Sequence, residues 1–166
     1  MPPIRLGISG WSYDGWRGTF YPHDLPHGKE LAYASQRFNS IELNASFYAL
    51  QRPDTYRGWY EATPSGFLFA VKGSRFITHN KKLRDVETPL ANFFASGILL
   101  LKEKLGPIVW QFAPSFKFEE ERLAAFLALL PRHTEDAARL ADKHEQSLAR
   151  AELDANGQQA TATLRH

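Results

Sequence analysis

The sequence contains no cysteine among its 166 residues. This absence excludes disulfide bonds, thiolate zinc sites, iron–sulfur clusters and cysteine nucleophiles. The sequence also lacks a long apolar run, because the longest one, Leu123–Leu130, ends at Pro131, and a membrane-spanning helix needs about 20 apolar residues. Arg5 and Gly7 occupy the place where the apolar core of a secretion signal would lie. We therefore expect a cytoplasmic protein with no membrane segment.

Several signatures of nucleotide and hydrolase chemistry are missing as well. The sequence has no Walker A motif, no Gly-x-Gly-x-x-Gly and no His-Glu-x-x-His. Residues 7–11 read Gly-Ile-Ser-Gly-Trp, which is not the Gly-x-Ser-x-Gly of a nucleophile elbow. His23 and His27 are four residues apart, but Pro22 and Pro26 disfavour the helix that would join them at one zinc ion. We predict no metal site, and the cofactor stays undetermined.

Excess charge of one sign is also scarce, since 20 Lys and Arg stand against 18 Asp and Glu, a net charge of +2. The distribution is nevertheless uneven. Residues 1–118 carry 14 basic and 9 acidic residues and 21 of the 22 aromatic ones, whereas residues 119–166 carry 6 basic and 9 acidic residues. The first part of the chain is therefore aromatic and basic, and the second part is Ala-rich and acidic.

Hydrophobic periodicity predicts alternating strands and helices. Strands are expected at about 4–9, 40–47, 67–73 and 108–112, and helices at about 29–38, 53–62, 88–106 and 119–130. This βαβαβαβα order favours an α/β fold with a parallel sheet in sequential strand order. A polar amphipathic helix is expected over 134–156. The tail 157–166 holds one large apolar residue, Leu164, and is expected to be flexible.

Residues 7–13, 16–22, 41–48, 69–72 and 75–79 carry the blocks Gly-Ile-Ser-Gly-Trp-Ser-Tyr, Trp-Arg-Gly-Thr-Phe-Tyr-Pro, Ile-Glu-Leu-Asn-Ala-Ser-Phe-Tyr, Phe-Ala-Val-Lys and Arg-Phe-Ile-Thr-His. Together with Lys104–Pro107 and Gln111–Phe116, these blocks resemble the YecE-like family, also called domain of unknown function 72. Ser46 and Ala49 depart from the Thr and Pro usual in the family. The resemblance implies a TIM-type (β/α)₈ barrel, which typically needs about 250 residues. Residues 1–133 would then be the N-terminal half, with about four βα units. We accordingly expect a missing C-terminal half or self-association.

In a parallel α/β fold, ligands bind at the carboxyl ends of the strands. Period-two alternation places polar side chains of these strands on one face of the sheet. The loop after the third strand adds Arg75 and His79. We predict Glu42 as a catalytic base and His79 as a catalytic acid or base. The predicted substrate-binding residues are Trp11, Asn44, Tyr48, Lys72, Arg75 and Gln111. The alternative for Glu42 is a structural ion pair with Lys72 or Arg5.

Two further groups allow more than one interpretation. The segment 72–84 carries five Lys or Arg and one His, which suits a phosphate-like anion, although Lys81, Lys82 and Arg84 would equally form a solvated loop. The aromatic residues of 11–21 either stack on a ligand or form a packed loop core.

Two functions follow from these residues. The first is a hydrolase or isomerase that acts on a phosphorylated or phosphodiester substrate, in effect a phosphoester hydrolase or sugar-phosphate enzyme. The second is a module that binds nucleic acid or a phosphorylated metabolite without turnover. The expected partner is a small phosphate-like anion, since the low net charge favours a pocket over a nucleic-acid surface.

Overall fold

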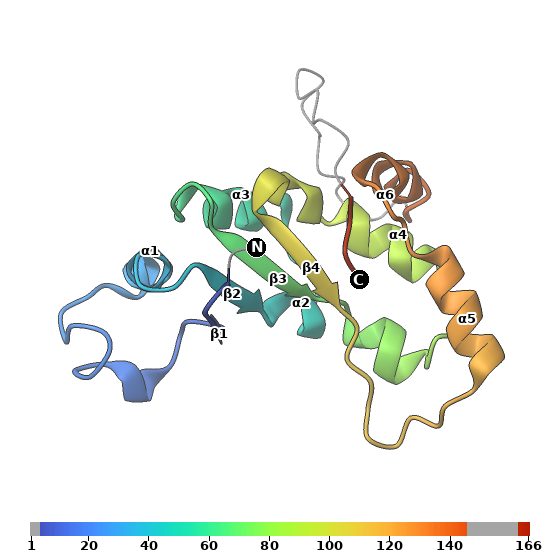
Figure 1. Ribbon diagram of the computed structural model, residues 1–166, viewed down its shortest axis with the longest axis horizontal. Coiled ribbons are helices and arrows are strands. Elements are labelled where there is room, and N and C mark those ends of the chain that lie inside the picture. The colour runs from blue at the N-terminus through green and yellow to red at the C-terminus, as the bar shows by residue number, and fades with distance from the viewer. Residues whose placement is uncertain (1–3, 146–162) are drawn as a thin grey trace.

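The sheet has four parallel strands in sequential order (Figure 1). The computed structural model describes residues 4–145 and 163–166. The strands are β1 (Gly7–Ser9), β2 (Ser40–Leu43), β3 (Leu68–Lys72) and β4 (Leu105–Val109), and each pairs in parallel with the next. The predicted parallel sheet and its strand order are therefore confirmed.

Helices connect the strands and extend beyond β4. The α-helices are α1 (Glu30–Ser35), α2 (Ala45–Tyr48), α3 (Pro53–Glu61), α4 (Glu87–Ala95), α5 (Glu120–Leu129) and α6 (Thr134–Ala141). Short 3₁₀ segments form η1 (Asp14–Trp16), η2 (His27–Lys29) and η4 (Ile98–Lys104), and η3 (Phe76–Asn80) is a π-helical turn. None of the helices in the described residues is long and apolar enough to cross a membrane.

The second strand ends earlier than the sequence predicts. Alternation suggests a strand over 40–47, but β2 ends at Leu43 and α2 begins at Ala45. Asn44 already has helical backbone angles, with φ −89° and ψ −24°. The Ser46 hydroxyl donates to the Lys72 carbonyl oxygen at 2.7 Å. This contact with the neighbouring strand cannot be predicted from the residues next to Ser46 in the sequence. Side chains after Leu43 therefore do not follow strand alternation.

The fourth strand is also shifted from its predicted position. It occupies Leu105–Val109 instead of 108–112, so Gly106 and Pro107 lie inside a strand and do not end a helix. A side chain at Gly106 would approach the Phe69 carbonyl oxygen to 2.7 Å, so glycine permits the close approach of β3 and β4. The expected long helix before it is divided at Gly97, whose φ of 114° separates α4 from η4.

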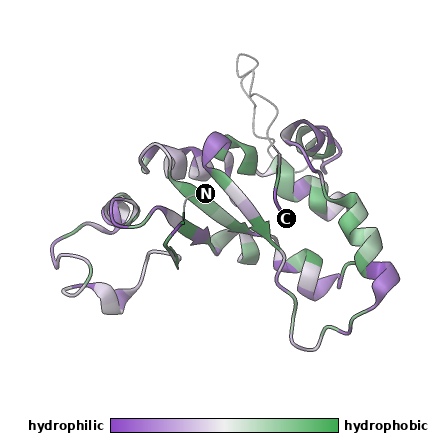
Figure 2. Ribbon diagram, in the orientation of Figure 1, coloured by the Kyte–Doolittle hydropathy of each residue, from purple (hydrophilic) through white to green (hydrophobic). Residues whose placement is uncertain are grey.

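The core lies on one face of the sheet. Ile41, Leu43, Phe69 and Val71 are completely buried, and Ile108 is 1% exposed. Figure 2 shows hydrophobic residues over most of β3 and β4 and over much of α5. The buried side chains alternate with side chains that face the other side of the sheet, as predicted for β2 and β3. That other face carries Glu42 and Lys72.

The last residues pack beside β4 (Figure 1). Leu164 is buried, and its amide donates to the Arg132 carbonyl oxygen at 2.8 Å. The Ile108 amide donates to the Arg165 carbonyl oxygen at 2.7 Å. Within the tail that the sequence predicts to be flexible, a buried leucine and backbone hydrogen bonds thus join residues 163–166 to β4 and Arg132. Of the helix expected over 134–156, the structure shows α6, which ends at Ala141; residues 146–162 lie outside the described part.

The stability of the fold at alkaline pH depends on Tyr56 of α3. Its side chain is completely buried, and its hydroxyl has no hydrogen-bond partner in the described residues. Burial raises the pKa of Tyr56 to about 12, and the smaller influence of the Ser96 side chain acts in the opposite direction. The Ser96 hydroxyl donates its own proton to the Phe93 carbonyl oxygen. Above pH 10 the unfolded tyrosine ionises while the folded one keeps its proton. The folded state then binds more protons, so stability falls as pH rises from 10 to about 12.

At pH 11 we expect Tyr56→Phe to remove about 1.4 kcal/mol of this alkaline loss, which is half of the roughly 2.7 kcal/mol that a shift of about two pKa units gives above pH 12. At pH 8 the variant should equal or slightly exceed the wild type, because an unsatisfied hydroxyl is removed. Urea unfolding at pH 8 and pH 11 measures both effects. Tyr48→Phe, at a position 69% exposed, is the control. An equal alkaline loss in Tyr56→Phe and the wild type would contradict the prediction.

Candidate functional site

A connected set of polar side chains lies at the carboxyl ends of β1, β2 and β3. Ser9 and Glu42 are direct register partners in the parallel ladder. The Ser9 hydroxyl donates to Glu42 Oε2 at 2.6 Å, and Lys72 Nζ lies 3.5 Å from the same oxygen. The Lys72 and Glu42 side chains are 19% and 26% exposed. The pair is therefore partly shielded, yet a ligand can reach it from the open face of the sheet.

Asn44 joins this network from the residue after β2. Its amide nitrogen donates to the Ser9 hydroxyl oxygen at 2.9 Å. The Ser9 hydroxyl thus accepts from Asn44 and donates to Glu42, so its orientation is fixed from both sides. Ser9 lies on the polar face that alternation predicts, but it is not among the predicted catalytic or substrate-binding residues. Its signal is the alternation of residues 4–9, which places it opposite the apolar side chain of Ile8.

Gly10 allows the chain to turn directly after Ser9. Its φ is 74°, and a side chain there would meet the Tyr13 hydroxyl at 3.3 Å and the Asn44 amide nitrogen at 3.5 Å. The Gly10 amide donates to the Glu42 backbone oxygen at 2.9 Å. A larger residue would be strained in this left-handed conformation and would crowd Asn44. Glycine therefore keeps the end of β1 against Glu42.

Phe47 connects Lys72 to His79. Lys72 Nζ lies 5.8 Å from the centre of the Phe47 ring, within cation–π range. The His79 ring meets the same phenyl ring edge-on at a centroid distance of 5.2 Å. His79 Nδ1 also shares a hydrogen bond of 2.9 Å with the Thr78 hydroxyl. The second ring nitrogen, Nε2, is left as the one available to a ligand.

Tyr48 and Arg75 lie at the margin of this cluster. Tyr48 is exposed and contacts Phe47 edge-on at 5.1 Å between ring centres. Arg75 is exposed at the start of η3, and its side chain has no hydrogen-bond or ion-pair partner within residues 4–145 and 163–166. Both side chains are therefore accessible to a ligand.

The structure does not bring Trp11 and Gln111 to this network. The Trp11 ring packs edge-on against Trp59 of α3 at 5.7 Å, and its carbonyl oxygen accepts a hydrogen bond from Tyr21. Gln111 is exposed two residues beyond the end of β4. β1 ends at Ser9 and β4 ends at Val109, before Trp11 and Gln111 respectively. The two-residue alternation of strand side chains therefore does not reach either position.

The loop between β1 and α1 is built around a buried carboxylate that the sequence patterns do not reveal. Glu30 is 1% exposed. It accepts hydrogen bonds from Arg17 at 3.0 Å and Ser12 at 2.9 Å, and lies 3.1 Å from His27 Nδ1. Arg17 also donates to the Leu25 carbonyl oxygen at 2.9 Å. These bonds fix the loop that follows Ser9.

The aromatic side chains of the same loop contact one another. Trp16 lies against Tyr13, Phe20 and Tyr21 at centroid distances of 4.6, 5.3 and 6.0 Å. Tyr21 is 1% exposed, and burial, with a smaller effect from the Glu30 charge, raises its pKa to about 12. Of the two interpretations of these aromatic residues, ligand stacking and a packed loop core, this arrangement agrees with the packed loop core. Within the described residues, no group of three or more His, Asp or Glu is placed to hold a metal ion.

Comparison with known proteins identifies related sequences that are longer than this chain. A family model described as protein of unknown function DUF72 matches residues 5–150. UPF0759 protein YunF of Bacillus subtilis is 30% identical over 126 residues, which cover 73% of this chain and 44% of YunF. UPF0759 protein YecE of Escherichia coli K12 is 28% identical over 130 residues, covering 70% of this chain and 45% of YecE. The chain thus spans about half the length of the curated relatives it matches.

The fold has a counterpart among solved structures. A crystal structure of a DUF72 family protein from Enterococcus faecalis superposes with a TM-score of 0.60 and 22% identity, over 76% of this chain and 45% of that one. A second crystal structure of that protein gives a TM-score of 0.53 and 20% identity over 75% of this chain and 45% of that one. At this level of identity the similarity concerns the fold.

Proposed function

The chain belongs to the DUF72 family of proteins of unknown function, and we propose that it acts as an enzyme on a small phosphorylated substrate, with hydrolysis of a phosphate ester as the reaction. One observation carries the proposal. At the carboxyl ends of three parallel strands, a partly buried carboxylate, Glu42, lies within 3.5 Å of the Lys72 ammonium and 2.6 Å of the Ser9 hydroxyl. A base next to a fixed cation suits attack on an anionic substrate.

The reaction divides among the residues as follows. Lys72 and Arg75 bind the phosphoryl oxygens, and Glu42 removes a proton from the attacking water. A bond forms between the water oxygen and phosphorus, and the ester P–O bond breaks. His79 donates a proton to the departing alkoxide, so the products are an alcohol and inorganic phosphate. Asn44 and Ser9 hold the Glu42 carboxylate in place through the two hydrogen bonds described above.

We further propose that the four βα units are the N-terminal half of a (β/α)₈ barrel. The parallel sequential sheet supports this, as do the polar residues on the face opposite the helix-packed core. The remaining strands would come from a further part of the polypeptide or from a second copy. In either case they would enclose the face that carries Glu42 and Lys72.

Glu42→Gln provides the test of the proposed function. Glutamine keeps an oxygen that accepts from Ser9 but loses the base, so we expect about a 100-fold loss of turnover with an unchanged fold. p-Nitrophenyl phosphate and bis(p-nitrophenyl) phosphate serve as chromogenic probes, and circular dichroism monitors folding. Glu61→Gln, an exposed carboxylate at the end of α3, is the matched control and should retain full activity.

Equal turnover in Glu42→Gln and the wild type would reject the catalytic assignment. Arg75 follows Lys72 by three residues, is exposed and has no side-chain partner within the described part of the chain, which favours a second candidate, a module that binds a phosphorylated metabolite without turnover. No turnover in the wild type, together with phosphate binding that Lys72→Met abolishes, would establish that candidate in place of the enzyme.

A further inference from the structure

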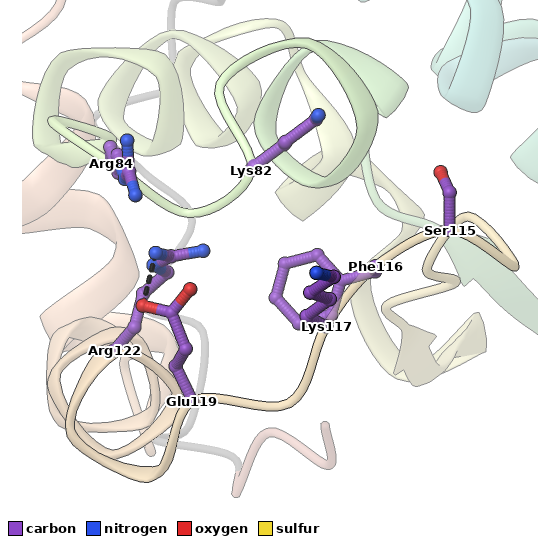
Figure 3. Close-up of a pocket in the computed structure, with 7 residues that line it drawn as sticks. All are labelled: Lys82, Arg84, Ser115, Phe116, Lys117, Glu119 and Arg122. Atoms are coloured by element: carbon purple, nitrogen blue, oxygen red, sulfur yellow. Dashed lines mark hydrogen bonds and ion pairs between the residues drawn. The ribbon is translucent and has the colours of Figure 1, made fainter.

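A second concave surface lies between the segment after η3 and the segment that joins β4 to α5 (Figure 3). Its volume is about 280 Å³. Both segments follow strands of the parallel sheet, and such connections form the ligand-binding side of α/β proteins. Among the lining residues only Glu119 is acidic, whereas four are basic: Lys82, Arg84, Lys117 and Arg122.

Most of the positive charge in this cavity is not neutralised. Arg122 forms an ion pair with Glu119, and its side chain is 14% exposed. Lys82, Arg84 and Lys117 are exposed, and none of the three side chains has a hydrogen-bond or ion-pair partner in the described part of the chain. Unpaired cations around a concave surface create a positive potential that attracts anions.

The backbone that presents two of these cations is held in an uncommon conformation. Lys82, Leu83 and Asp85 have φ values of 51°, 66° and 48°, a region that costs non-glycine residues free energy. Leu83 fixes this turn, because its side chain is 5% exposed and its amide donates to the Ile77 carbonyl oxygen at 3.1 Å. Lys82 and Arg84 flank the buried leucine. The backbone positions of Lys82 and Arg84 are therefore set before any ligand binds.

An aromatic ring lies next to the cations. Figure 3 shows Phe116 and Lys117 on the opposite side of the cavity from Arg84 and Arg122. The Phe116 ring stacks on the Phe112 ring, with ring centres 4.8 Å apart and planes inclined by 29°. A planar base or a sugar can pack on such a ring while its phosphate meets the cations.

We propose that this cavity binds the phosphate group of a nucleotide. Lys82, Arg84 and Lys117 contact the phosphate oxygens, and Phe116 packs against the base or sugar. The proposal goes beyond the function proposed above, because neither Glu42 nor Lys72 lines this cavity. It holds whether or not Glu42 is catalytic.

Isothermal titration of AMP into the wild type and single variants tests the proposal. We expect Arg84→Gln and Lys117→Gln each to weaken AMP binding about tenfold, the loss of one charge-assisted contact. Phe116→Ala should weaken AMP binding but leave inorganic phosphate binding unchanged. Adenosine, which lacks the phosphate, should bind at least tenfold more weakly than AMP. Arg52→Gln, an exposed cation before α3, is the matched control.

The outcomes separate the two sites and the two sources of phosphate. Because AMP is itself a phosphate ester, the titrations are repeated in Lys72→Met, which lacks the cation of the Glu42 site. AMP binding that persists in Lys72→Met and is weakened by adding Arg84→Gln belongs to this cavity, whatever the outcome for catalysis. Tighter binding of the oligonucleotide (dT)₈ than of AMP would assign the phosphate to a nucleic-acid strand, and the reverse order to a free nucleotide. Failure of the wild type to bind either probe would overturn the proposal, as would equal AMP affinities in Arg84→Gln, Lys117→Gln and the wild type.

Discussion

Replacing Glu30 by alanine is expected to lower the free energy of unfolding by about 3–5 kcal/mol. The change removes three contacts to a carboxylate that is 1% exposed. It also leaves the Arg17 guanidinium, 23% exposed, without its ion-pair partner. An unpaired charge in a partly desolvated place costs more than the pair contributes, which is why removing one partner has a large effect.

A set of variants distinguishes charge loss from lost packing. Glu30→Gln keeps an oxygen for Ser12 but loses the charge, so its cost should be smaller than that of Glu30→Ala. The double variant Arg17→Met/Glu30→Leu should be more stable than Glu30→Ala, because no unpaired charge remains. Glu61→Ala, at an exposed position, should change stability by less than about 0.5 kcal/mol. Urea unfolding measured by tryptophan fluorescence follows all four.

The Glu30 result also bears on the candidate site. The loop that Glu30 holds starts one residue after Ser9, and Ser12 itself donates to Glu30. Loosening the loop should therefore disturb the Ser9–Glu42 hydrogen bond. A loss of less than 1 kcal/mol in Glu30→Ala would show that the loop is held by its aromatic contacts instead.

The sequence predicts the sheet and places Glu42 and Lys72 on one face, with an ion pair between them as the structural alternative to a catalytic Glu42, because both features depend on strand alternation. Ile41, Leu43 and Val71 alternate with Glu42 and Lys72, and parallel register then brings Glu42 and Lys72 to one edge of the sheet. These features require only local periodicity and the rule that successive βα units pair in parallel.

Features that depend on contacts between distant residues were beyond such reasoning. The end of β2 at Leu43 involves the hydrogen bond from Ser46 to the Lys72 carbonyl oxygen, and the position of β4 requires Gly106 against Phe69. Trp11 and Gln111 lie past the true strand ends, so the alternation that selected them no longer applies there. Nothing in the local pattern around Glu30 indicates burial, because its partners lie up to 18 residues away.

Lys104 is the second residue whose replacement should have a large effect. It lies at the end of η4 and is 5% exposed. Its ammonium donates to the Tyr60 and Thr63 carbonyl oxygens, each at 2.6 Å, and lies 4.3 Å from the centre of the Tyr60 ring. Burial lowers the pKa of Lys104, and the charge of Glu103 partly opposes this shift. The side chain thus satisfies carbonyl groups at the C-terminus of α3, where a cation is favourable.

We expect Lys104→Met to lower the free energy of unfolding by about 2–4 kcal/mol. Methionine fills a similar volume, so the loss of stability reports chiefly on two carbonyl groups left without a donor, which cost about 1–3 kcal/mol each. The variant is also spared the cost of desolvating the ammonium, which reduces the net loss. Urea unfolding gives the stability, and amide hydrogen exchange should show faster opening at the end of α3 than in β2. Lys29→Met, at an exposed position in η2, controls for loss of a lysine. A stable Lys104→Met with unchanged exchange at α3 would mean that water satisfies those carbonyls and that the lysine is not required.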